Sequence, residues 1–288
     1  MFAHARSLLY RPCATSERLA PGVHRVRLSN SFLDVLGFCV EFFLIDELMI
    51  DTGHRHQRRE VLDLLAGRRL RAIALTHHHE DHNGNAGPLA ARHDCPVYLA
   101  RPELLATEGL DRLPLYRRFF WGRPAPYEPE PMPDELDTGS RTLLALRTPG
   151  HSATHTVLFD PDSGLALVGD LFLSERLTPT MPQEQPSVLA ASLRSLADLG
   201  PRRIANAHGK LINHPEAYLR RKADLLDTAA ERVRSLHRSG AKEAEIVARV
   251  FPSPSRHDRI NAWMSQGDYS YRCFVRGCLR DSQISRSE

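Results

Sequence analysis

Residues 76–82 of this chain read Thr-His-His-His-Glu-Asp-His, so four of seven consecutive side chains are imidazoles. This segment directly follows the apolar run Ala72-Ile73-Ala74-Leu75, which is typical of a buried strand. Residues two apart in an extended chain face the same side, so His77 and His79 point together and His78 points away. The pattern predicts two imidazoles that share one metal ion at the end of a strand.

Further donors are directed toward the same place. Asp81 and His82 stand where the chain turns toward a helix, and they offer a carboxylate and an imidazole that suit zinc, iron or manganese. Other metal-type residues also follow apolar runs: Asp51, His151, Asp170 and His208. Because ligand sites in mixed sheets gather at the carboxyl ends of strands, we expect these side chains to meet at one rim. Without a metal, such a cluster would leave desolvated groups unpaired, which is costly.

The rest of the chain alternates short apolar runs with segments of helical length. Residues 22–203 contain apolar runs that end in polar or glycine-containing turns, and residues 58–70 and 188–199 have helical patterns. With 288 residues, of which 42% are hydrophobic and 25% charged, the chain can bury a substantial core. These features predict a layered α/β (α+β) protein.

Residues 111–133 interrupt this alternation. Five prolines fall within residues 124–133, and neither a helix interior nor a central strand accepts them. A long excursion from a compact domain is usually a lid, a binding loop or a disordered linker, and the aromatic content here favours a lid. We expect Phe119, Phe120 and Trp121 to cover an acyl or ring substrate or to anchor the loop.

The last quarter of the sequence is predicted to be helical. Pro215 suits a first helical position, and apolar residues then recur at intervals of three or four until Gly240 ends the pattern. Further helical stretches are expected near residues 242–250, 256–265 and 269–279. We therefore divide the chain into a catalytic domain of residues 1–214 and a helical C-terminal region of residues 215–288.

The motif and its later partners resemble the metallo-β-lactamase superfamily, whose core is a four-layer αββα sandwich with an H-x-H-x-D-H motif and three later ligands. The resemblance covers roughly residues 22–214. It implies a complete set of ligands: His77, His79 and His151 for one metal, Asp81, His82 and His208 for a second, and Asp170 as the bridge. It also implies that Asp51, in the family's D-T-G segment, supports the ligands from behind. His155 is expected to orient a ligand, to contact substrate or to pack beside the site.

Differences from the sequences of particular family members narrow the choice of activity within the family. Asp170 stands where several antibiotic-hydrolysing members have a cysteine, which argues against a β-lactamase. The histidine-rich segment is similar to that of glyoxalase II, but Gly84-Asn85 replaces its Gly-Gly and residues 207–210, Ala-His-Gly-Lys, replace its His-Glu-Tyr-Thr. The helical ending is similar to thioesterase-like, lactonase-like and small endoribonuclease-like members. Lys210 is a further candidate for substrate contact.

The resemblance and the donor set together predict a metal-dependent hydrolase that cleaves a thioester or lactone of a small organic acid. Two divalent cations, zinc first and iron or manganese as alternatives, would activate a bridging hydroxide that attacks the carbonyl. Asp170 would hold both ions, and Asp81 would pass a proton to the leaving group. The alternatives are a phosphodiesterase or ribonuclease of the same fold, a mono-iron persulfide dioxygenase-like oxidoreductase, and a ligand-binding regulatory protein.

Composition adds limits on partners and location. The net charge of +3 gives little support to a nucleic-acid platform, and no stretch is apolar enough for a membrane helix. Five scattered cysteines indicate free thiols rather than a disulfide framework. With no signal-peptide core, these features predict a cytoplasmic protein with a small-molecule substrate, and a homodimer is one candidate assembly. His54, His56 and the triplet Arg220-Arg221-Lys222 are expected to face solvent.

Overall fold

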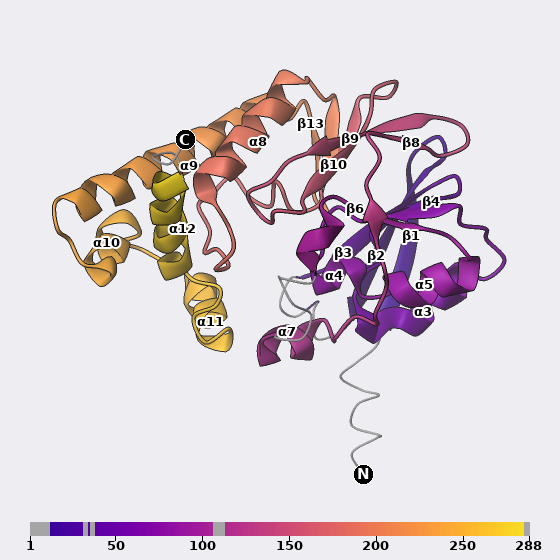
Figure 1. Cartoon of the computed structure of the whole chain (residues 1–288), viewed down its shortest axis with the longest axis horizontal. Helices are drawn as coiled ribbons and strands as arrows, with labels where there is room; N and C mark the ends of the chain where they lie inside the picture. The colour runs from indigo at the N-terminus through magenta and orange to yellow at the C-terminus, as the bar shows by residue number, and fades with distance from the viewer. Residues whose placement is uncertain (1–11, 31–33, 35–37, 106–112, 285–288) are drawn as a thin grey trace, which may run out of the picture.

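The protein is built around two β-sheets that pack face to face (Figure 1). The computed structural model describes residues 12–30, 34, 38–105 and 113–284. The first sheet contains, in spatial order, β1 (Pro12–Ala20), β2 (Val23–Asn30), β3 (Val40–Ile45), β4 (Leu48–Ile50), β5 (Ala72–Ala74), β6 (Val97–Leu99) and β7 (Glu130–Pro131). The second contains β13 (Leu211–Asn213), β12 (Arg203–Ala205), β11 (Leu165–Leu167), β10 (Thr156–Asp160), β9 (Thr142–Arg147) and β8 (Glu135–Asp137). The first strand begins before residue 22, where the family resemblance starts.

Parallel pairs within each sheet fix where the polar loops emerge. Strands β4 and β5 run parallel, so the chain leaves both at the same edge after Ile50 and Ala74. Strands β11 and β12 also run parallel, so the loops after Leu167 and Ala205 both begin at one edge of the second sheet. The remaining pairs of the second sheet are antiparallel. This arrangement brings four of the predicted run ends to the carboxyl edges of the two sheets.

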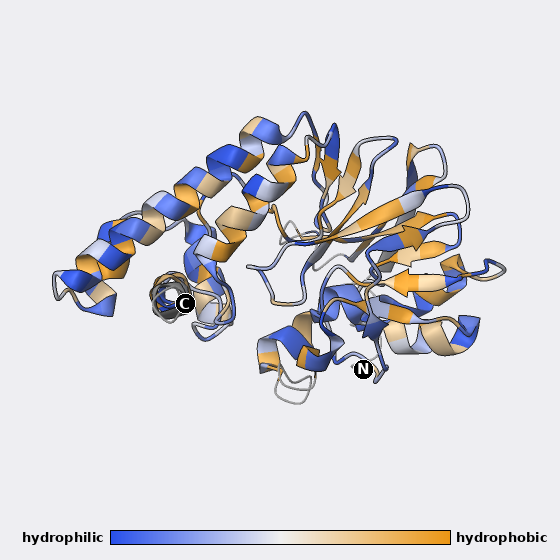
Figure 2. Ribbon diagram, turned by 45° about the horizontal axis from the view of Figure 1, so that its top comes forward, coloured by the Kyte–Doolittle hydropathy of each residue, from blue (hydrophilic) through white to orange (hydrophobic). Residues whose placement is uncertain are grey.

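Each sheet is sandwiched between apolar layers. On β3, Phe43 and Ile45 point into the cluster between the sheets, whereas Phe42 and Leu44 point into the cluster under the outer helices. This alternation is the two-residue period of an extended strand. Because β3 is covered on both faces, all six of its residues are buried. Figure 2 shows the strands of both sheets coloured mostly as hydrophobic.

Helices cover the outer face of each sheet. Helices α3 (Arg58–Leu64) and α5 (Ala86–His93) share the apolar cluster outside the first sheet. Helices α8 (Pro186–Asp198) and α9 (Glu216–Arg238) share the cluster outside the second sheet. Short helical segments complete this part of the chain: η1 (Arg55–Gln57), α4 (Glu80–Asn83), η2 (Pro102–Leu104) and α7 (Leu115–Phe120). The predicted αββα layers are confirmed.

The C-terminal residues form helices that pack on the second sheet's side of the molecule (Figure 1). After α9 come α10 (Glu243–Val250), α11 (Arg256–Met264) and α12 (Tyr271–Ile284). Apolar side chains of α9, α10 and α12 belong to the same buried cluster as those of α8. Within the described residues, no helix has the length and apolar character needed to cross a membrane.

The proline-rich excursion is only partly regular. It begins within residues 106–112, which lie outside the described residues, and continues into α7. The prolines at 124, 126, 129 and 133 lie outside helices and strands, and Pro131 lies on β7, which adds two residues to the edge of the first sheet. Proline is tolerated there because an edge strand needs fewer ladder hydrogen bonds.

Candidate metal centre

Two groups of metal-type side chains lie where strands of both sheets end. The first group is His77, His79 and His151, and the second is Asp81, His82, Asp170 and His208. Within each group, the atoms that could bind an ion all lie within 4.8 Å of one another. The structure therefore brings together all seven residues that the sequence singled out as ligands.

Local geometry explains how one short segment serves both groups. His79 is the extended residue that precedes α4, with φ −69° and ψ 154°. The strand ends at Ala74 and the chain bends at Thr76 and His78, yet the rings of His77 and His79 face together as predicted. Asp81 and His82 lie in the single turn of α4, where the change to helical geometry turns their side chains toward the second group.

The nitrogens of the first group are closely spaced. Nδ1 of His79 lies 2.9 Å from Nε2 of His77 and 3.0 Å from Nε2 of His151. Nitrogens bound at about 2.1 Å to one tetrahedral ion would lie about 3.4 Å apart. Both distances are thus within about 0.5 Å of the spacing that one ion requires, and the His77 and His151 nitrogens lie within 4.8 Å of each other.

Asp170 lies between the two groups. Its Oδ1 is 3.2 Å from Nε2 of His208 and 3.5 Å from Nε2 of His82. Its Oδ2 is 3.6 Å from Nε2 of His151 in the first group. Asp81 closes the second group, with Oδ2 3.6 Å from Nε2 of His208. One carboxylate therefore faces both groups.

Asp51 supports the second group from behind. Its Oδ2 lies 2.8 Å from Nδ1 of His82 and accepts the Thr76 hydroxyl at 2.8 Å, while its Oδ1 accepts the Thr76 backbone N–H at 2.8 Å. The backbone of Asp51 has φ +60°, a conformation that a non-glycine residue seldom adopts. Because Nδ1 of His82 is held by this carboxylate, Nε2 is left to face the group.

His155 and His78 lie on different sides of the ligands. Nε2 of His155 accepts the backbone N–H of Asp170 at 3.2 Å. Burial, with a contribution from His151, lowers the pKa of His155 to about 3, so the ring is neutral and can accept. His78 instead places Nδ1 2.9 Å from the hydroxyl of Thr154. The structure thus puts His155 behind Asp170 and turns His78 away.

The electrostatics of the first group favour neutral ligands. Burial lowers the pKa of His77 well below its ordinary value, with the neighbouring imidazoles adding to the effect. Burial, Arg117 and the other imidazoles do the same for His79. Neutral imidazole is the form that binds a metal.

The second group favours a positive charge in its middle. Burial opposes charge on His82, but Asp51 and the other nearby carboxylates outweigh it and raise the pKa of His82. Burial also opposes charge on His208, but Asp170 and, to a smaller extent, Asp81 outweigh it and raise the pKa of His208 to about 9. Burial opposes ionisation of Asp170, yet His208 and His82 hold the pKa of Asp170 well below its usual range. Divalent cations would supply the same kind of charge.

Two buried atoms of the second group support this fit. Among the described residues, Nε2 of His82 and Oδ1 of Asp170 are buried polar atoms for which no neighbour has hydrogen-bond geometry, although Nε2 of His208 lies 3.2 Å from Oδ1. Buried polar groups are nearly always satisfied, so such atoms require an explanation. Both belong to a donor set of nitrogen and carboxylate oxygen that suits a divalent metal. The residues therefore fit the metal centre that the family resemblance implies.

Other residues at the site were missed by the sequence reasoning. Gln183 and Glu184 touch the outer nitrogens of His79 and His151 from the loop before α8. Glu80, the first residue of α4, is buried and pairs with Arg117 of α7 at 2.8 Å. No strand end or motif spacing marks these positions in the sequence.

Two predictions of solvent exposure are wrong. His54 is fully buried, because it turns inward after Gly53 and places Nε2 2.9 Å from Oε1 of Gln57. Lys222 is buried on the inner face of α9, where its ammonium donates to the carbonyl of Arg176. Burial lowers the pKa of Lys222 to about 8. His56 and Arg221 are exposed as predicted, whereas Arg220 is half-buried.

The candidate substrate contacts lie at the end of α7 and just after His208. Phe119 is 67% exposed on α7, the Phe120 ring packs 5.6 Å from it, and the Trp121 ring lies 5.6 Å from His54. Lys210 is exposed two residues after His208. Contact of these four residues with a substrate stays a prediction.

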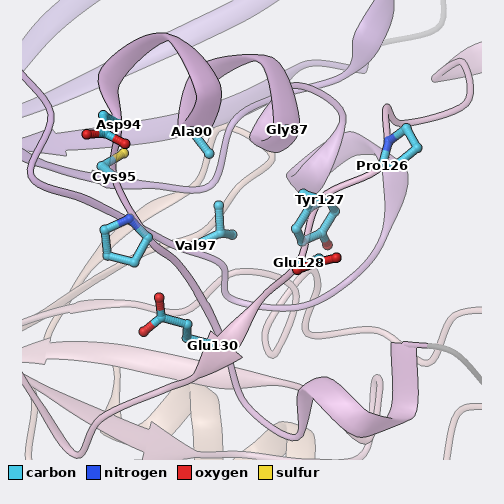
Figure 3. A pocket seen from close by; sticks show the side chains of 10 residues that line it. Gly87, Ala90, Asp94, Cys95, Val97, Pro126, Tyr127, Glu128 and Glu130 are labelled. Carbon is cyan, nitrogen blue, oxygen red and sulfur yellow. The ribbon is translucent and has the colours of Figure 1, made fainter.

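A separate surface pocket of about 380 Å³ lies beside α5 (Figure 3). None of the seven candidate ligands lines it. Tyr127, on its wall, accepts a hydrogen bond from Nδ2 of Asn83 at 3.0 Å. A Cβ on Gly87 would lie 2.3 Å from the carbonyl oxygen of Pro126, so the proline-rich segment packs directly on α5 here. The pocket marks that packing rather than the metal centre.

The alternation of the histidines yields a first prediction. His79→Ala should remove a ligand from the first group and lose metal, whereas His78→Ala should retain the wild-type metal content. His78→Ala should cost only about 0.5–1.5 kcal/mol of stability, because it removes one hydrogen bond while Oγ of Ser152 still lies 3.2 Å from the Thr154 hydroxyl. Elemental analysis of the desalted, metal-loaded variants tests the contrast. Equal metal loss in both variants would show that His78 is not turned away in solution.

Comparison with protein families gives one extended match. The family model described as the metallo-beta-lactamase superfamily matches residues 45–208, a range that includes all seven candidate ligands.

Curated relatives are more distant. The chain is 27% identical over 176 residues to the probable metallo-hydrolase YybB of Bacillus subtilis, an alignment that covers 59% of this chain and 79% of the relative. It is 27% identical over 154 residues to the hydroxyacylglutathione hydrolase of Methylobacillus flagellatus, covering 53% of each. It is 55% identical over 113 residues to that of Bdellovibrio bacteriovorus, covering 38% of this chain and 39% of the relative. The chain thus spans about half or less of these two hydroxyacylglutathione hydrolases.

Solved structures share the fold. A metallo-beta-lactamase family protein of Thermus thermophilus, TTHA1429, has a TM-score of 0.65 at 21% identity and covers 92% of this chain and 95% of its own. A beta-lactamase domain protein of Burkholderia ambifaria has a TM-score of 0.66 at 19% identity, with 93% and 88% covered. TTHA1623, solved in a di-iron-bound form, has a TM-score of 0.51 at 29% identity, with 62% and 91% covered.

Proposed function

Because the chain belongs to the metallo-β-lactamase superfamily and is a metallo-hydrolase, we propose that it hydrolyses a thioester of a small organic acid at a centre of two divalent cations. The observation that carries the proposal is Asp170, whose two oxygens face two separate groups of ligands. The hydroxyacylglutathione hydrolases among the relatives support the thioester over other ester-like bonds. Zinc is the first candidate metal, and the di-iron form of TTHA1623 supports iron as the alternative.

The proposed chemistry divides between the metals and the chain. Bound cations would polarise the substrate carbonyl and make water nucleophilic near neutral pH. His77, His79 and His151 would hold one cation, Asp81, His82 and His208 would hold the other, and Asp170 would join them. Asp51 and His155 would keep His82 and Asp170 in place through the hydrogen bonds described above. No serine or cysteine nucleophile is required.

Asp81 is the residue proposed to move the proton. Its carboxylate lies at the rim of the second group, with Oδ2 3.6 Å from His208 and 3.8 Å from His82. A carboxylate beside the attacking water can accept its proton and return it to the departing sulfur. This gives Asp81 a part in both attack and departure.

A substrate panel tests the proposed function. Purified protein of measured metal content should hydrolyse acyl thioesters, including a 2-hydroxyacyl glutathione and an acyl coenzyme A, faster than lactones or bis-p-nitrophenyl phosphate. Stripping the metal with a chelator should abolish this activity, and adding back zinc or iron should restore it. A strong preference for the phosphodiester would replace the proposal by phosphodiesterase activity, and oxygen uptake with a persulfide would replace it by oxidation.

The number of ions is a separate prediction. Metal-loaded and desalted protein should contain close to two ions per chain, because two ligand groups meet at one carboxylate. Elemental analysis checks the number. A stable value near one, even under excess metal, would contradict the dinuclear centre.

Phe119 should influence the choice of substrate. Helix α7 is fixed beside the motif by the Arg117–Glu80 pair, and Phe119 is exposed on it. Phe119→Ala should raise KM for a bulky acyl thioester by about 10-fold. This factor corresponds to the free energy gained when part of one aromatic side chain is buried against the substrate. The small activated ester p-nitrophenyl acetate serves as the control and should show little change in KM. Equal changes for both substrates would place Phe119 away from the acyl group.

A further inference from the structure

The loop before α8 brings two polar side chains against the first ligand group. The amide nitrogen of Gln183 lies 3.0 Å from Nε2 of His79. Oε2 of Glu184 lies 3.4 Å from Nδ1 of His151, and its Oε1 accepts the backbone N–H of Met181 at 2.8 Å. Glu184 is buried, so its carboxylate is held within the protein. Both side chains therefore contact the ring nitrogen that does not face the group.

Those outer nitrogens need hydrogen-bond acceptors. An imidazole that gives one nitrogen to a metal carries a proton on the other, and the partner of that proton fixes the tautomer and the ring orientation. The Glu184 carboxylate is such an acceptor for Nδ1–H of His151. The Gln183 amide becomes one for Nε2–H of His79 when it is turned by 180°, because its oxygen and nitrogen occupy equivalent places.

The same loop is fastened to the C-terminal helices. Thr180 and Ser270, which precedes α12, exchange two backbone hydrogen bonds of 3.0 and 3.4 Å. Arg280 of α12 donates to the carbonyl oxygen of Pro182 and, at 3.3 Å, to that of Glu184. Helix α12 lies beside α8 in Figure 1.

The approach of α12 to this loop is close. A Cβ on Gly277 would lie 2.7 Å from the carbonyl oxygen of Glu184 and 2.9 Å from Cδ of Pro186. Only a glycine allows the helix backbone to come this near without displacing the loop. Helix α12 therefore contacts the backbone of Glu184, the residue whose side chain touches His151.

We propose that residues 180–185 act as a strap through which α12 orients His79 and His151 and so sets the metal affinity of the first group. Glu184 and Gln183 are positioning residues, since they act through the two imidazoles. The inference rests on the metal centre of the proposed function and is independent of the thioester substrate. The C-terminal helices then contribute to the metal centre itself.

Cobalt(II) binding to the full-length, metal-stripped protein tests the strap. The visible absorption of cobalt reports ligand geometry, and a titration separates the two sites by affinity. Glu184→Gln keeps the side-chain volume but removes the charged acceptor. It should lower the affinity of one of the two ions by about 10- to 100-fold and change that ion's spectrum, with the other ion unaffected. Arg280→Ala should shift the same site in the same direction by a smaller factor.

A variant on the same helix provides the control. Arg276 of α12 pairs with Glu243 on the surface at 2.7 Å, so Arg276→Ala should bind both ions as the wild type does. Wild-type affinities and spectra in Glu184→Gln and Arg280→Ala would overturn the proposal. So would an equal loss in Arg276→Ala, because this would indicate a general weakening of α12.

Thermal melting of the metal-free variants shows whether each one is folded. If Glu184→Gln does not fold, Gln183→Ala tests the strap through His79, because Gln183 is only half-buried. It should lower the cobalt affinity of one site, and wild-type affinities at both sites would contradict the strap. A wild-type chain that binds no metal would overturn the proposed function and the strap together. Intact metal sites without thioesterase activity would overturn the proposed substrate and leave the strap standing.

Discussion

Asp170→Ala is expected to abolish hydrolysis while leaving the fold in place. The Asp170 carboxylate lies 3.2 Å from His208 and 3.6 Å from His151, so its loss removes a donor from both ligand groups at once. Removing a partner of a metal ligand already costs about 10- to 100-fold in metal affinity, and removing a shared ligand should cost at least about 100-fold. We therefore expect turnover near the uncatalysed background and a metal content below two ions per chain.

The apolar clusters on either side of the second sheet do not include Asp170, so the variant should remain folded. Turnover, metal content and the melting temperature of the metal-free protein measure the outcome. A matched pair isolates the role of the position, since Asp170 and Asp160 are both buried carboxylates of the second sheet and its loops. Asp160 pairs with Arg141, so Asp160→Asn should lower stability but keep both metals and activity. Asp170→Asn should instead lose bound metal and activity. A tenth of wild-type activity with two bound ions in Asp170→Ala would contradict its place as the shared ligand.

The sequence predicted those parts of the site that local rules determine. Two-residue alternation separated His78 from His77 and His79, and the structure shows His78 against Thr154 instead. Parallel strands end at one edge of a sheet, so residues after β4, β5, β11 and β12 could be expected to meet before any contact was known. The assignment of ligands to particular ions came from the family resemblance.

The contacts that sequence reasoning missed depend on distant parts of the chain. Glu184 reaches His151 because the loop before α8 is fastened by Arg280, which lies 96 residues later in the sequence. No local pattern encodes such a contact. Lys222 is different, because it lies three residues after Leu219 and four before Leu226, both of which are buried on α9. That helical spacing puts Lys222 on the inner face of α9. The prediction of exposure was wrong because it relied on the charge of the side chain and not on this spacing.

Gly150→Ala should cause the largest loss of stability among single substitutions near the site. Gly150 has φ +129°, and a Cβ there would lie 2.4 Å from both the nitrogen and the Cα of Leu189 in α8. These are backbone atoms of a helix that packs on α9, so they cannot move aside as a side-chain end would. Gly150 also accepts the backbone N–H of Gln185 at 2.8 Å, which ties the start of α8 to the residue before His151. Backbone strain and overpacking each cost about 1–3 kcal/mol, so we expect a combined loss of about 3–5 kcal/mol in the free energy of unfolding.

Gly139→Ala separates the two causes of this loss. Gly139 has φ +109° and no atom within 4 Å of a Cβ placed on it, so its substitution adds strain without collision. It should cost only about 1–2 kcal/mol and leave the metal content unchanged. Denaturant unfolding of the metal-free proteins measures both losses, and cobalt binding to the folded fraction reports any displacement of His151. A loss in Gly150→Ala no greater than that in Gly139→Ala would mean that α8 can move away from Gly150. Its contact with the loop before His151 would then not be rigid, and α8 would contribute little to the orientation of His151.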